Sequence, residues 1–279
     1  MQAAISPIKW PAEAIWEAVA PILPGFTVEV LPEIDSTNTE LMRRAKAGHI
    51  VPILLVAEKQ TAGRGRLGRD WHDLAERNDT IPSLTFSLGL ALSPVDWSGL
   101  SLAVGLSIAQ SLHADIGLKW PNDLWLSADK DDRKLAGILI ETCAVGQLRY
   151  VVVGVGINMT KPAENLDSLA KPSKPLRRAP AWLQELMPQM TAPDALLCIT
   201  PALLQTILTF AAQGFAPFQA GFNQRDVLRN RRVSVDDNLA DAKVTTGLAL
   251  GVNTKGELEI QTALGKTTIN SSEVSLKPL

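Results

Sequence analysis

Apolar residues recur along the first third of the chain in two spacings, one typical of helices and one typical of strands. Residues 10–20 carry apolar side chains at helical spacing, which predicts a short helix. A second helix is predicted over residues 38–47, where Thr37 and Glu40 match a capping box. Apolar runs bounded by polar residues predict strands over 26–31, 53–57 and 84–88.

The middle of the chain mixes both patterns. A helix is predicted over residues 101–114, and two short strands flank the Pro-Asn-Asp bend at 121–123. Two longer strands are predicted over 134–142 and 150–158. Gly137 lies inside the first of these strands, and an interior strand glycine often marks a place where a ligand approaches the backbone.

The last third of the chain changes in character near Asp226. Before it, residues 161–190 predict a long surface segment with one short helix at 181–186, and residues 195–213 predict a helix apart from Pro201. After it, strand patterns follow at 232–235, 244–252, 257–261 and 267–270. The predicted fold class is α/β (α+β), with a mixed sheet and flanking helices in a domain at 1–225 and a small β-barrel domain at 226–279.

The composition limits which partners and which cellular compartment are expected for the protein. The 279 residues can bury a full core, and the formal net charge of −2 gives no overall attraction to nucleic acid or anionic membranes. No apolar run reaches the length needed to span a bilayer, and the first residues lack a signal-peptide pattern. Cys143 and Cys198 lie among apolar residues and predict buried thiols in a reducing compartment, so a cytoplasmic protein is expected.

Residues 60–71, which we call the arginine loop, combine three glycines with three arginines directly after a predicted strand. Glycine permits positive φ and close approach of N–H groups to an anion, and arginine fits carboxylate and phosphate oxygens. The loop is therefore predicted to fold over a negatively charged ligand. Gly63-x-Gly65-x-x-Gly68 also matches the dinucleotide-binding pattern, although no acidic residue ends the strand at 84–88. A solvated basic turn is the other alternative.

Polar residues at the ends of other predicted elements are further candidates for a site. Ser36, Thr37 and Asn38 precede or begin the second helix, and they offer more hydrogen-bonding groups than one cap uses. They are therefore either capping residues or ligands of a neutral polar group. Asp123 is either a structural residue of its bend or a reactive carboxylate, and Lys119 stands in the adjoining strand.

Five segments, taken in order, resemble the biotin protein ligases (biotin–[acetyl-CoA-carboxylase] ligases). They are residues 36–38, 60–69, 119–123, 133–141 and 154–158. The resemblance is close over about residues 30–159 and loose over the C-terminal β segment. It implies a mixed sheet like that of class II synthetases, followed by an SH3-like barrel.

The resemblance implies a two-step reaction. Biotin and ATP form biotinyl-5′-AMP and release pyrophosphate, and the biotinyl group then passes to a lysine of the biotin carboxyl carrier protein. Because the carboxylate and the α-phosphate are both negative, the site must screen their repulsion. Arg64, Arg66, Lys119 and Lys134 can supply that charge, and Mg²⁺ is expected on the ATP phosphates, with Asp123 as a nearby carboxylate.

The same resemblance assigns individual residues. Lys134, Arg66, Asp123 and Lys119 are the expected catalytic residues, and Lys134 faces the biotin carboxylate and the phosphate. Asp123 is also expected to orient and deprotonate the incoming lysine amine. The residues matched to contacts with biotin or its adenylate are Ser36, Thr37, Asn38, Gln60, Gly63, Arg64, Arg66, Trp71, Lys134, Gly137 and Asn158.

Some expectations concern segments and partners. Residues 73–83 are polar and longer than in the family, and we expect them to form a lid. Too few residues precede the first predicted strand for a helix-turn-helix domain, so an enzyme rather than a repressor is expected. No nucleic-acid or membrane partner is expected, and a homodimer is left open.

Two other functions share part of the pattern. A lipoate or octanoate ligase or transferase would have the same fold, but the transferase needs a nucleophilic cysteine beside a lysine. Cys143 has no obvious activating base. A sensor that binds biotinyl-5′-AMP without turning it over would need neither Asp123 nor Lys134.

Overall fold

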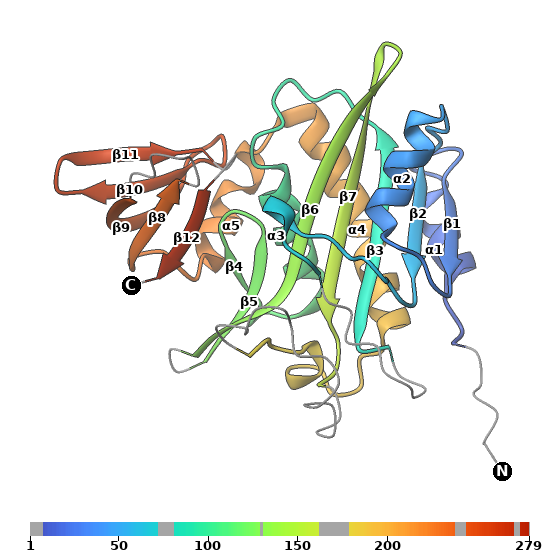
Figure 1. Cartoon of the computed structure of the whole chain (residues 1–279), viewed down its shortest axis with the longest axis horizontal. Helices are drawn as coiled ribbons and strands as arrows, with labels where there is room; N and C mark the ends of the chain where they lie inside the picture. Colours follow the sequence, from blue (N-terminus) through green and yellow to red (C-terminus); the bar gives the residue numbers. More distant parts are fainter. Residues whose placement is uncertain are drawn as a thin grey trace. The chain divides into compact units, whose positions relative to one another are not determined.

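The computed structural model describes residues 8–71, 81–128, 131–161, 179–237, 244–270 and 274–278 (Figure 1). The chain divides into a first unit, Met1–Ser93 with Asp131–Pro201, and a second unit, Pro94–Lys130 with Ala202–Leu279. Most of the predicted lid at 73–83 and much of the predicted surface segment at 161–190 lie outside the described residues.

The first unit is built on strands in the spatial order β1-β2-β3-β7-β6. Their bounds are β1 (Thr27–Leu31), β2 (Ile53–Ala57), β3 (Ser83–Ala91), β6 (Asp131–Val145) and β7 (Leu148–Asn158). The pair β1 and β2 is parallel, and the pairs β2–β3, β3–β7 and β6–β7 are antiparallel. The predicted mixed sheet is therefore confirmed.

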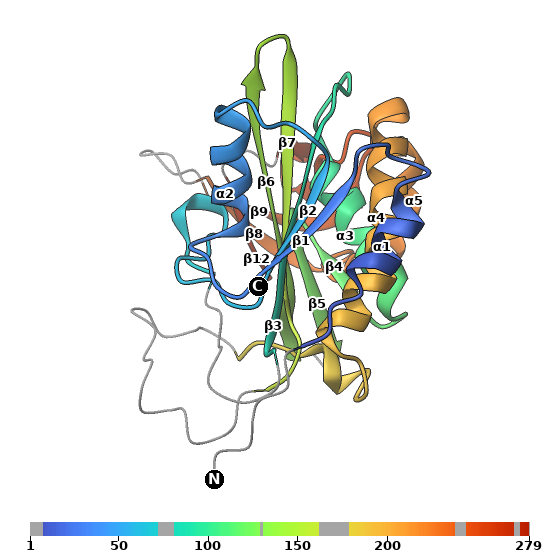
Figure 2. The same ribbon diagram turned by 90° about the vertical axis from the view of Figure 1, so that its right-hand side faces the viewer.

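The two faces of this sheet differ because side chains alternate along each strand. One face of β3 carries buried Leu84, Phe86 and Leu88, whereas the opposite face carries Ser83, Thr85, Ser87 and Gly89. Gly154, Gly156 and Asn158 of β7 pair with Ser87, Thr85 and Ser83, so they share that second face, which we call the polar face. Helix α2 (Thr37–Lys46) lies on the polar face, and α1 (Ala12–Val19) lies on the apolar one (Figure 2).

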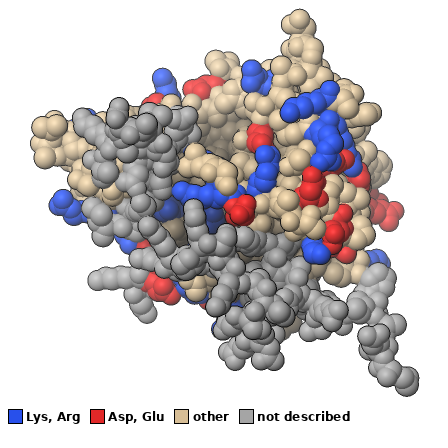
Figure 3. Space-filling model, viewed as in Figure 1, with Lys and Arg blue, Asp and Glu red and all other residues tan. Residues whose placement is uncertain are grey.

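Helix α2 starts differently from its prediction. Ser36 is the N-cap, and its Oγ accepts a hydrogen bond from the Thr39 N–H at 3.4 Å. Glu40 pairs instead with Arg43 and Arg44, because two charged donors one turn later compete for its carboxylate. The predicted capping box is therefore wrong by one position. Figure 3 shows further places where basic side chains (blue) lie beside acidic ones (red) on one face of the protein.

The second unit holds a helical part and a separate sheet. Its helices are α3 (Leu100–Leu112), η4 (Ala216–Phe218) and α5 (Gln219–Arg225), and β4 (Gly117–Lys119) pairs antiparallel with β5 (Asp123–Ala128). An antiparallel sheet follows in the order β11-β10-β9-β8-β12. Its strands are β8 (Arg232–Asp237), β9 (Val244–Val252), β10 (Leu258–Thr262), β11 (Gly265–Ile269) and β12 (Val274–Pro278). Strand β12 was not predicted, and β11 and β12 are the edges of the sheet among the described residues.

Helix α4 (Ala192–Gln213) runs through Pro201 and is long and apolar enough to cross a membrane, although no such segment was expected. Its composition is explained by packing, since one stripe of the helix is fully buried in the protein. That stripe contains Ala195, Leu196, Ile199, Leu203, Leu204, Ile207 and Phe210. Both cysteines are free, but Cys198 is exposed on α4 and Cys143 is half-buried, so the prediction of two buried thiols is wrong.

Asp226, between α5 and β8, has a carboxyl that is largely withdrawn from water. Its Oδ1 accepts a hydrogen bond from the Leu228 N–H at 2.9 Å, and burial raises the pKa of the carboxyl from 3.8 to about 6. Because the folded-state pKa lies above the unfolded one, this group contributes stability that is complete below pH 3.8 and is lost as the pH rises through about 6.

Asp226→Asn is expected to raise the free energy of unfolding at neutral pH, by up to about 3 kcal/mol, because the amide keeps an acceptor for Leu228 without a buried charge. The gain should vanish at acidic pH. Urea unfolding at a series of pH values measures it, and a variant with the same pH dependence as the wild type would contradict the assignment.

Candidate functional site

The arginine loop folds as a hairpin closed on itself. The Gly65 N–H donates to the Arg69 carbonyl oxygen at 2.7 Å, and the Trp71 N–H donates to the Gly63 carbonyl oxygen at 2.9 Å. A single 3₁₀ turn, η1 (Arg66–Gly68), forms the tip. A dinucleotide-binding loop leads directly into an α-helix, and this loop does not, so that interpretation of its glycines is wrong.

The glycines of the loop serve different purposes. Gly68 has a positive φ of 66°, and its neighbour Leu67 has a φ of 58°. Gly63 is required for space instead, because a Cβ atom there would lie 2.6 Å from the Trp71 carbonyl oxygen. Close approach of two strands of the hairpin, rather than backbone freedom, therefore explains Gly63.

The Trp71 side chain lies on two glycines of the polar face, Gly137 of β6 and Gly156 of β7, which we call the glycine floor. A Cβ atom on Gly156 would lie 2.5 Å from the indole ring, and one on Gly137 would lie 3.4 Å from it. The Lys134 Nζ is 5.9 Å from the ring centroid and 3.0 Å from the Cβ position of Gly137. The structure thus brings together three residues that the sequence predicted, Trp71, Lys134 and Gly137, with Gly156 as a fourth member of the cluster.

Thr37 and Asn38 are buried and bonded to groups outside their helix. The Gln60 Oε1 accepts a hydrogen bond from the Thr37 N–H at 2.8 Å and lies 3.2 Å from the Thr37 Oγ1. The Ser87 hydroxyl lies 2.7 Å from the Thr37 Oγ1 and 2.6 Å from the Asn38 Oδ1. These two residues are therefore not merely caps. Ser87 was not predicted, although the alternation of serine and threonine with apolar residues along β3 indicated its face.

Arg64 and Glu141 join the loop to the sheet. The Arg64 Nη2 is 2.5 Å from the Glu141 Oε2, and the Asn38 Nδ2 donates to the same oxygen at 3.0 Å. Arg64 is half-exposed, yet this ion pair shows that the loop is more than a solvated basic turn. Glu141 was not predicted as a site residue.

The main chain of Lys134 is held by the segment that follows the undescribed residues 162–178. The Lys134 carbonyl oxygen accepts hydrogen bonds from the Ala181 N–H at 2.8 Å and the Asn158 Nδ2 at 3.3 Å. Arg133 forms an ion pair with Glu185 at 2.6 Å, and this contact lowers the pKa of the Glu185 carboxyl. Asn158, predicted as a ligand contact, therefore also fastens the end of β7 to Lys134.

Lys119 and Asp123 belong to the second unit and face each other across the β4–β5 pair. The Lys119 Nζ lies 4.5 Å from the ring centroid of Trp125. The intervening Trp120 is buried, and its Nε1 donates to the Gly256 carbonyl oxygen at 3.1 Å. Within the described ranges, no group of three or more His, Cys, Asp or Glu side chains is placed to hold a metal ion.

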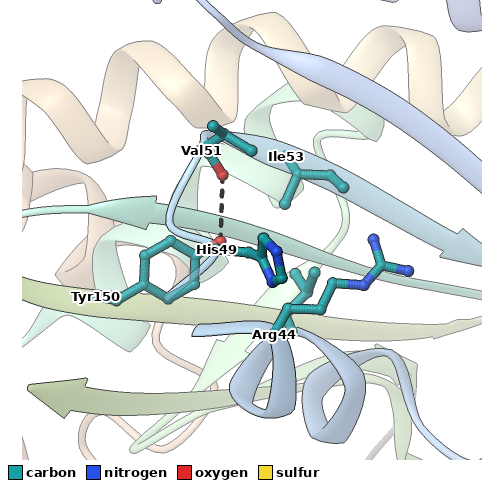
Figure 4. Close-up of a pocket in the computed structure, with 6 residues that line it drawn as sticks. Arg44, His49, Val51, Ile53 and Tyr150 are labelled. Carbon is teal, nitrogen blue, oxygen red and sulfur yellow. Dashed lines mark hydrogen bonds between the residues drawn. The ribbon is translucent and has the colours of Figure 1, made fainter. Parts of the chain in front are cut away.

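A separate cavity of about 370 Å³ lies beside the second half of α2 (Figure 4). Its lining residues are Leu41, Arg44, His49, Val51, Ile53 and Tyr150. The Tyr150 hydroxyl donates to the Val51 carbonyl oxygen at 3.4 Å, and burial raises the pKa of Tyr150 to about 12. None of the predicted site residues lines this cavity.

Gly156→Ala is expected to destabilise the protein by about 1–3 kcal/mol, because the new methyl group and the Trp71 ring cannot share the same space. Adding Trp71→Ala should restore most of the loss. Gly65→Ala is the matched control, since its nearest neighbour would be an ordinary contact at 3.4 Å. Urea unfolding of the variants measures the effects, and equal stabilities of Gly156→Ala and the wild type would contradict the placement of Trp71.

Comparison with known proteins places this cluster in a family. The model of the biotin/lipoate A/B protein ligase family matches residues 30–158, which include almost all of the first-unit site. The bifunctional ligase/repressor BirA of Escherichia coli is 32% identical over 249 residues, which is 86% of this chain and 70% of that protein. The chain belongs to the biotin/lipoate A/B protein ligase family.

Two further relatives extend the comparison. A biotin–[acetyl-CoA-carboxylase] ligase of Mycobacterium tuberculosis is 38% identical over 151 residues, covering 50% of this chain and 52% of that one. A biotin protein ligase of Aquifex aeolicus, solved in complex with biotin and ATP, superposes with a TM-score of 0.68 and 26% identity. That match covers 90% of this chain and 99% of the other.

Proposed function

We propose that this family member is a biotin–protein ligase, which joins biotin and ATP into biotinyl-5′-AMP and then transfers biotin to a lysine of a biotin carboxyl carrier protein. The proposal rests above all on one observation: Thr37, Asn38, Trp71 and Lys134 all lie against residues on the polar face of the sheet. The named ligases among the relatives, and the biotin and ATP complex of one of them, support the same reaction.

For the first step, we propose that cations around the glycine floor supply the positive charge that screens the two anionic reactants. Lys134 projects over Gly137, where its ammonium can meet both the biotin carboxylate and the α-phosphate. Arg66 begins the tip of the arginine loop and is assigned to the same anions when the loop covers them. Such fixed charges stabilise the transition state, because they need no reorganisation as the negative charge shifts between oxygens.

For the neutral head of biotin we assign the groups at the start of α2. Ser36, Thr37, Asn38 and Gln60 supply hydrogen-bonding groups there, and the bonds between Thr37 and Gln60 hold them in fixed directions. Gly63 lets the loop approach this region, and Trp71 covers the glycine floor. Arg64 and Asn158 complete the proposed set of ligand contacts.

Asp123 and Lys119 are assigned to the nucleotide and to the acceptor amine. Mg²⁺ commonly binds through one or two carboxylates together with substrate phosphates, so Asp123 suits such an ion without a dedicated protein cage. The ion would reduce the negative charge of the phosphates. We also propose that the antiparallel sheet is the SH3-like part of the family fold and that the domain boundary lies near 226.

The proposal also covers the cellular location, the macromolecular partner and the oligomeric state of the protein. A cytoplasmic location agrees with two cysteines that form no disulfide. We expect a carrier domain rather than nucleic acid as the macromolecular partner. Sedimentation of the purified protein would show whether it forms a homodimer.

A lipoate or octanoate transferase is the second candidate, and the geometry disfavours it. Cys143 lies on β6 nine positions after Lys134, which is roughly 30 Å at the rise of a strand. Cys143 packs against the apolar cluster that contains Leu41 and Tyr150. A nucleophilic thiol needs a nearby base or cation, and these neighbours supply neither.

The deciding experiment mixes the protein with ATP, Mg²⁺ and a biotin carrier domain, together with biotin, lipoate or octanoate. Pyrophosphate release and mass labelling of the carrier should occur with biotin. Labelling by lipoate or octanoate alone would overturn the assignment. Tight binding of biotinyl-5′-AMP without pyrophosphate release from biotin and ATP would favour a sensor.

A further inference from the structure

Glu141 of β6 joins two parts of the site that are far apart in the sequence. One carboxylate oxygen, Oε2, lies 2.5 Å from the Arg64 Nη2 of the arginine loop and 3.0 Å from the Asn38 Nδ2 at the start of α2. Only about a quarter of the Glu141 side chain is exposed. A single oxygen therefore bridges the arginine loop and helix α2.

The Asn38 amide can adopt only one orientation at this bridge. Its Nδ2 donates to Glu141 and also to the Leu139 carbonyl oxygen at 3.2 Å, while its Oδ1 accepts from the Ser87 hydroxyl at 2.6 Å. A flipped amide would place its oxygen against the Glu141 carboxylate and against a carbonyl oxygen. Gly154 leaves the necessary room, since a Cβ there would lie 2.0 Å from the Asn38 Oδ1.

From Asn38 the contacts continue to the other polar groups of the site. The Ser87 hydroxyl also lies 2.7 Å from the Thr37 Oγ1, and the Thr37 N–H donates to the Gln60 Oε1 at 2.8 Å. Gln60 is itself the first residue of the arginine loop. The bonds thus form a closed circuit that leaves the loop at Arg64 and returns to it at Gln60.

We propose that Glu141 is a positioning residue that couples the arginine loop to the start of α2 and so controls how long the activated intermediate is retained. This inference rests on the proposed ligase function. In this arrangement the charge of Arg64 is largely compensated by Glu141, so the main effect of Arg64 is to fix the position of the loop beside the ligand. Arg66 and Lys134 then supply most of the positive charge that meets the reactants.

The Arg64–Glu141 contact should affect the opening of the arginine loop, whereas an ordinary surface ion pair would have no such local effect. A half-exposed arginine–carboxylate pair contributes little to global stability. A hydrogen bond to a charged group at a closed loop can nevertheless change the local opening of that loop about tenfold or more. Loss of Glu141 should therefore alter loop opening and ligand release far more than the unfolding midpoint.

The test uses Glu141→Ala, Glu141→Gln, Arg64→Ala and the double variant Glu141→Ala with Arg64→Ala, in the full chain. Two quantities are measured: the release rate of biotinyl-5′-AMP, and hydrogen exchange in residues 60–71 without ligand, where the Gly65 and Trp71 amides are hydrogen-bonded. Glu33→Ala is the matched control, because Glu33 forms an exposed ion pair with Lys59 at 2.6 Å outside the circuit.

Glu141→Ala should raise both the release rate and the exchange about tenfold and raise the KM for biotin, with kcat for adenylation changed less than about threefold. Arg64→Ala should have a similar effect, and the double variant should be no worse than either single one. Glu141→Gln keeps both hydrogen bonds and should lie between the wild type and Glu141→Ala. It also serves as the test if Glu141→Ala does not fold.

Unchanged release and exchange in the Glu141 variants, or effects of Glu141→Ala and Arg64→Ala that simply add, would overturn the coupling. Failure of the wild type to form biotinyl-5′-AMP would count against the ligase function instead. Hydrogen exchange would still decide the coupling in that case, because it requires no ligand.

Discussion

Lys134→Ala should lower the rate of biotinyl-5′-AMP synthesis by about two to three orders of magnitude while leaving the fold intact. The Lys134 ammonium projects over the glycine floor beside Trp71, where two anionic reactants would meet. Its removal leaves their mutual repulsion unscreened at the reacting atoms. Pyrophosphate release at saturating biotin and ATP measures the loss.

The matched control for this variant is Lys46→Ala. Lys46 is an exposed lysine in the last turn of α2, and its loss should leave the rate near that of the wild type. Circular dichroism and the urea midpoint should be unchanged for both variants. If Lys134→Ala retained the wild-type rate, the screening charge would have to come from another residue.

Arg66→Gly should let biotinyl-5′-AMP leave the protein faster, by about tenfold or more, and should cause labelling of lysines on unrelated proteins. Arg66 begins η1 at the tip of the arginine loop. Without its guanidinium the loop loses a charged contact to the phosphate, so the reactive intermediate escapes before the carrier arrives. Rapid dilution of preformed complex measures the release rate.

The variant Leu67→Gly tests whether lost charge or added backbone flexibility explains the effect of Arg66→Gly. Leu67 already has a φ of 58°, which glycine adopts without strain, so this variant adds backbone freedom at the same turn and keeps every charge. Release close to the wild-type rate is expected. If Leu67→Gly released the adenylate as fast as Arg66→Gly, flexibility rather than charge would explain the effect.

Features that depend on local spacing could be predicted from the sequence. The strands at 53–57 and 150–158 lie where the apolar runs placed them, because burial of both faces requires such runs. The proximity of Trp71, Gly137 and Lys134 was expected from motifs whose order matches a known family. Local pattern alone would not have placed these three residues in one site.

Features that depend on long-range contacts could not be predicted. Glu141 meets Arg64 and Asn38 across 77 and 103 positions of sequence, and nothing in the residues around Glu141 indicates either partner. The predicted start of α2 was wrong by one position, because the Glu40 carboxylate pairs with arginine side chains and not with a backbone N–H group. Cys198 was expected inside because its neighbours are apolar, but helical geometry turns it outward.

The hairpin form of the arginine loop has a kinetic consequence. Fixing the backbone of a free segment costs about 1–2 kcal/mol for each residue. Here the bonds from Gly65 to Arg69 and from Trp71 to Gly63 already hold the segment in one shape. We therefore expect the loop to open as a preformed unit that rotates at its two ends, so the temperature dependence of turnover should show no contribution from refolding of the loop at each cycle.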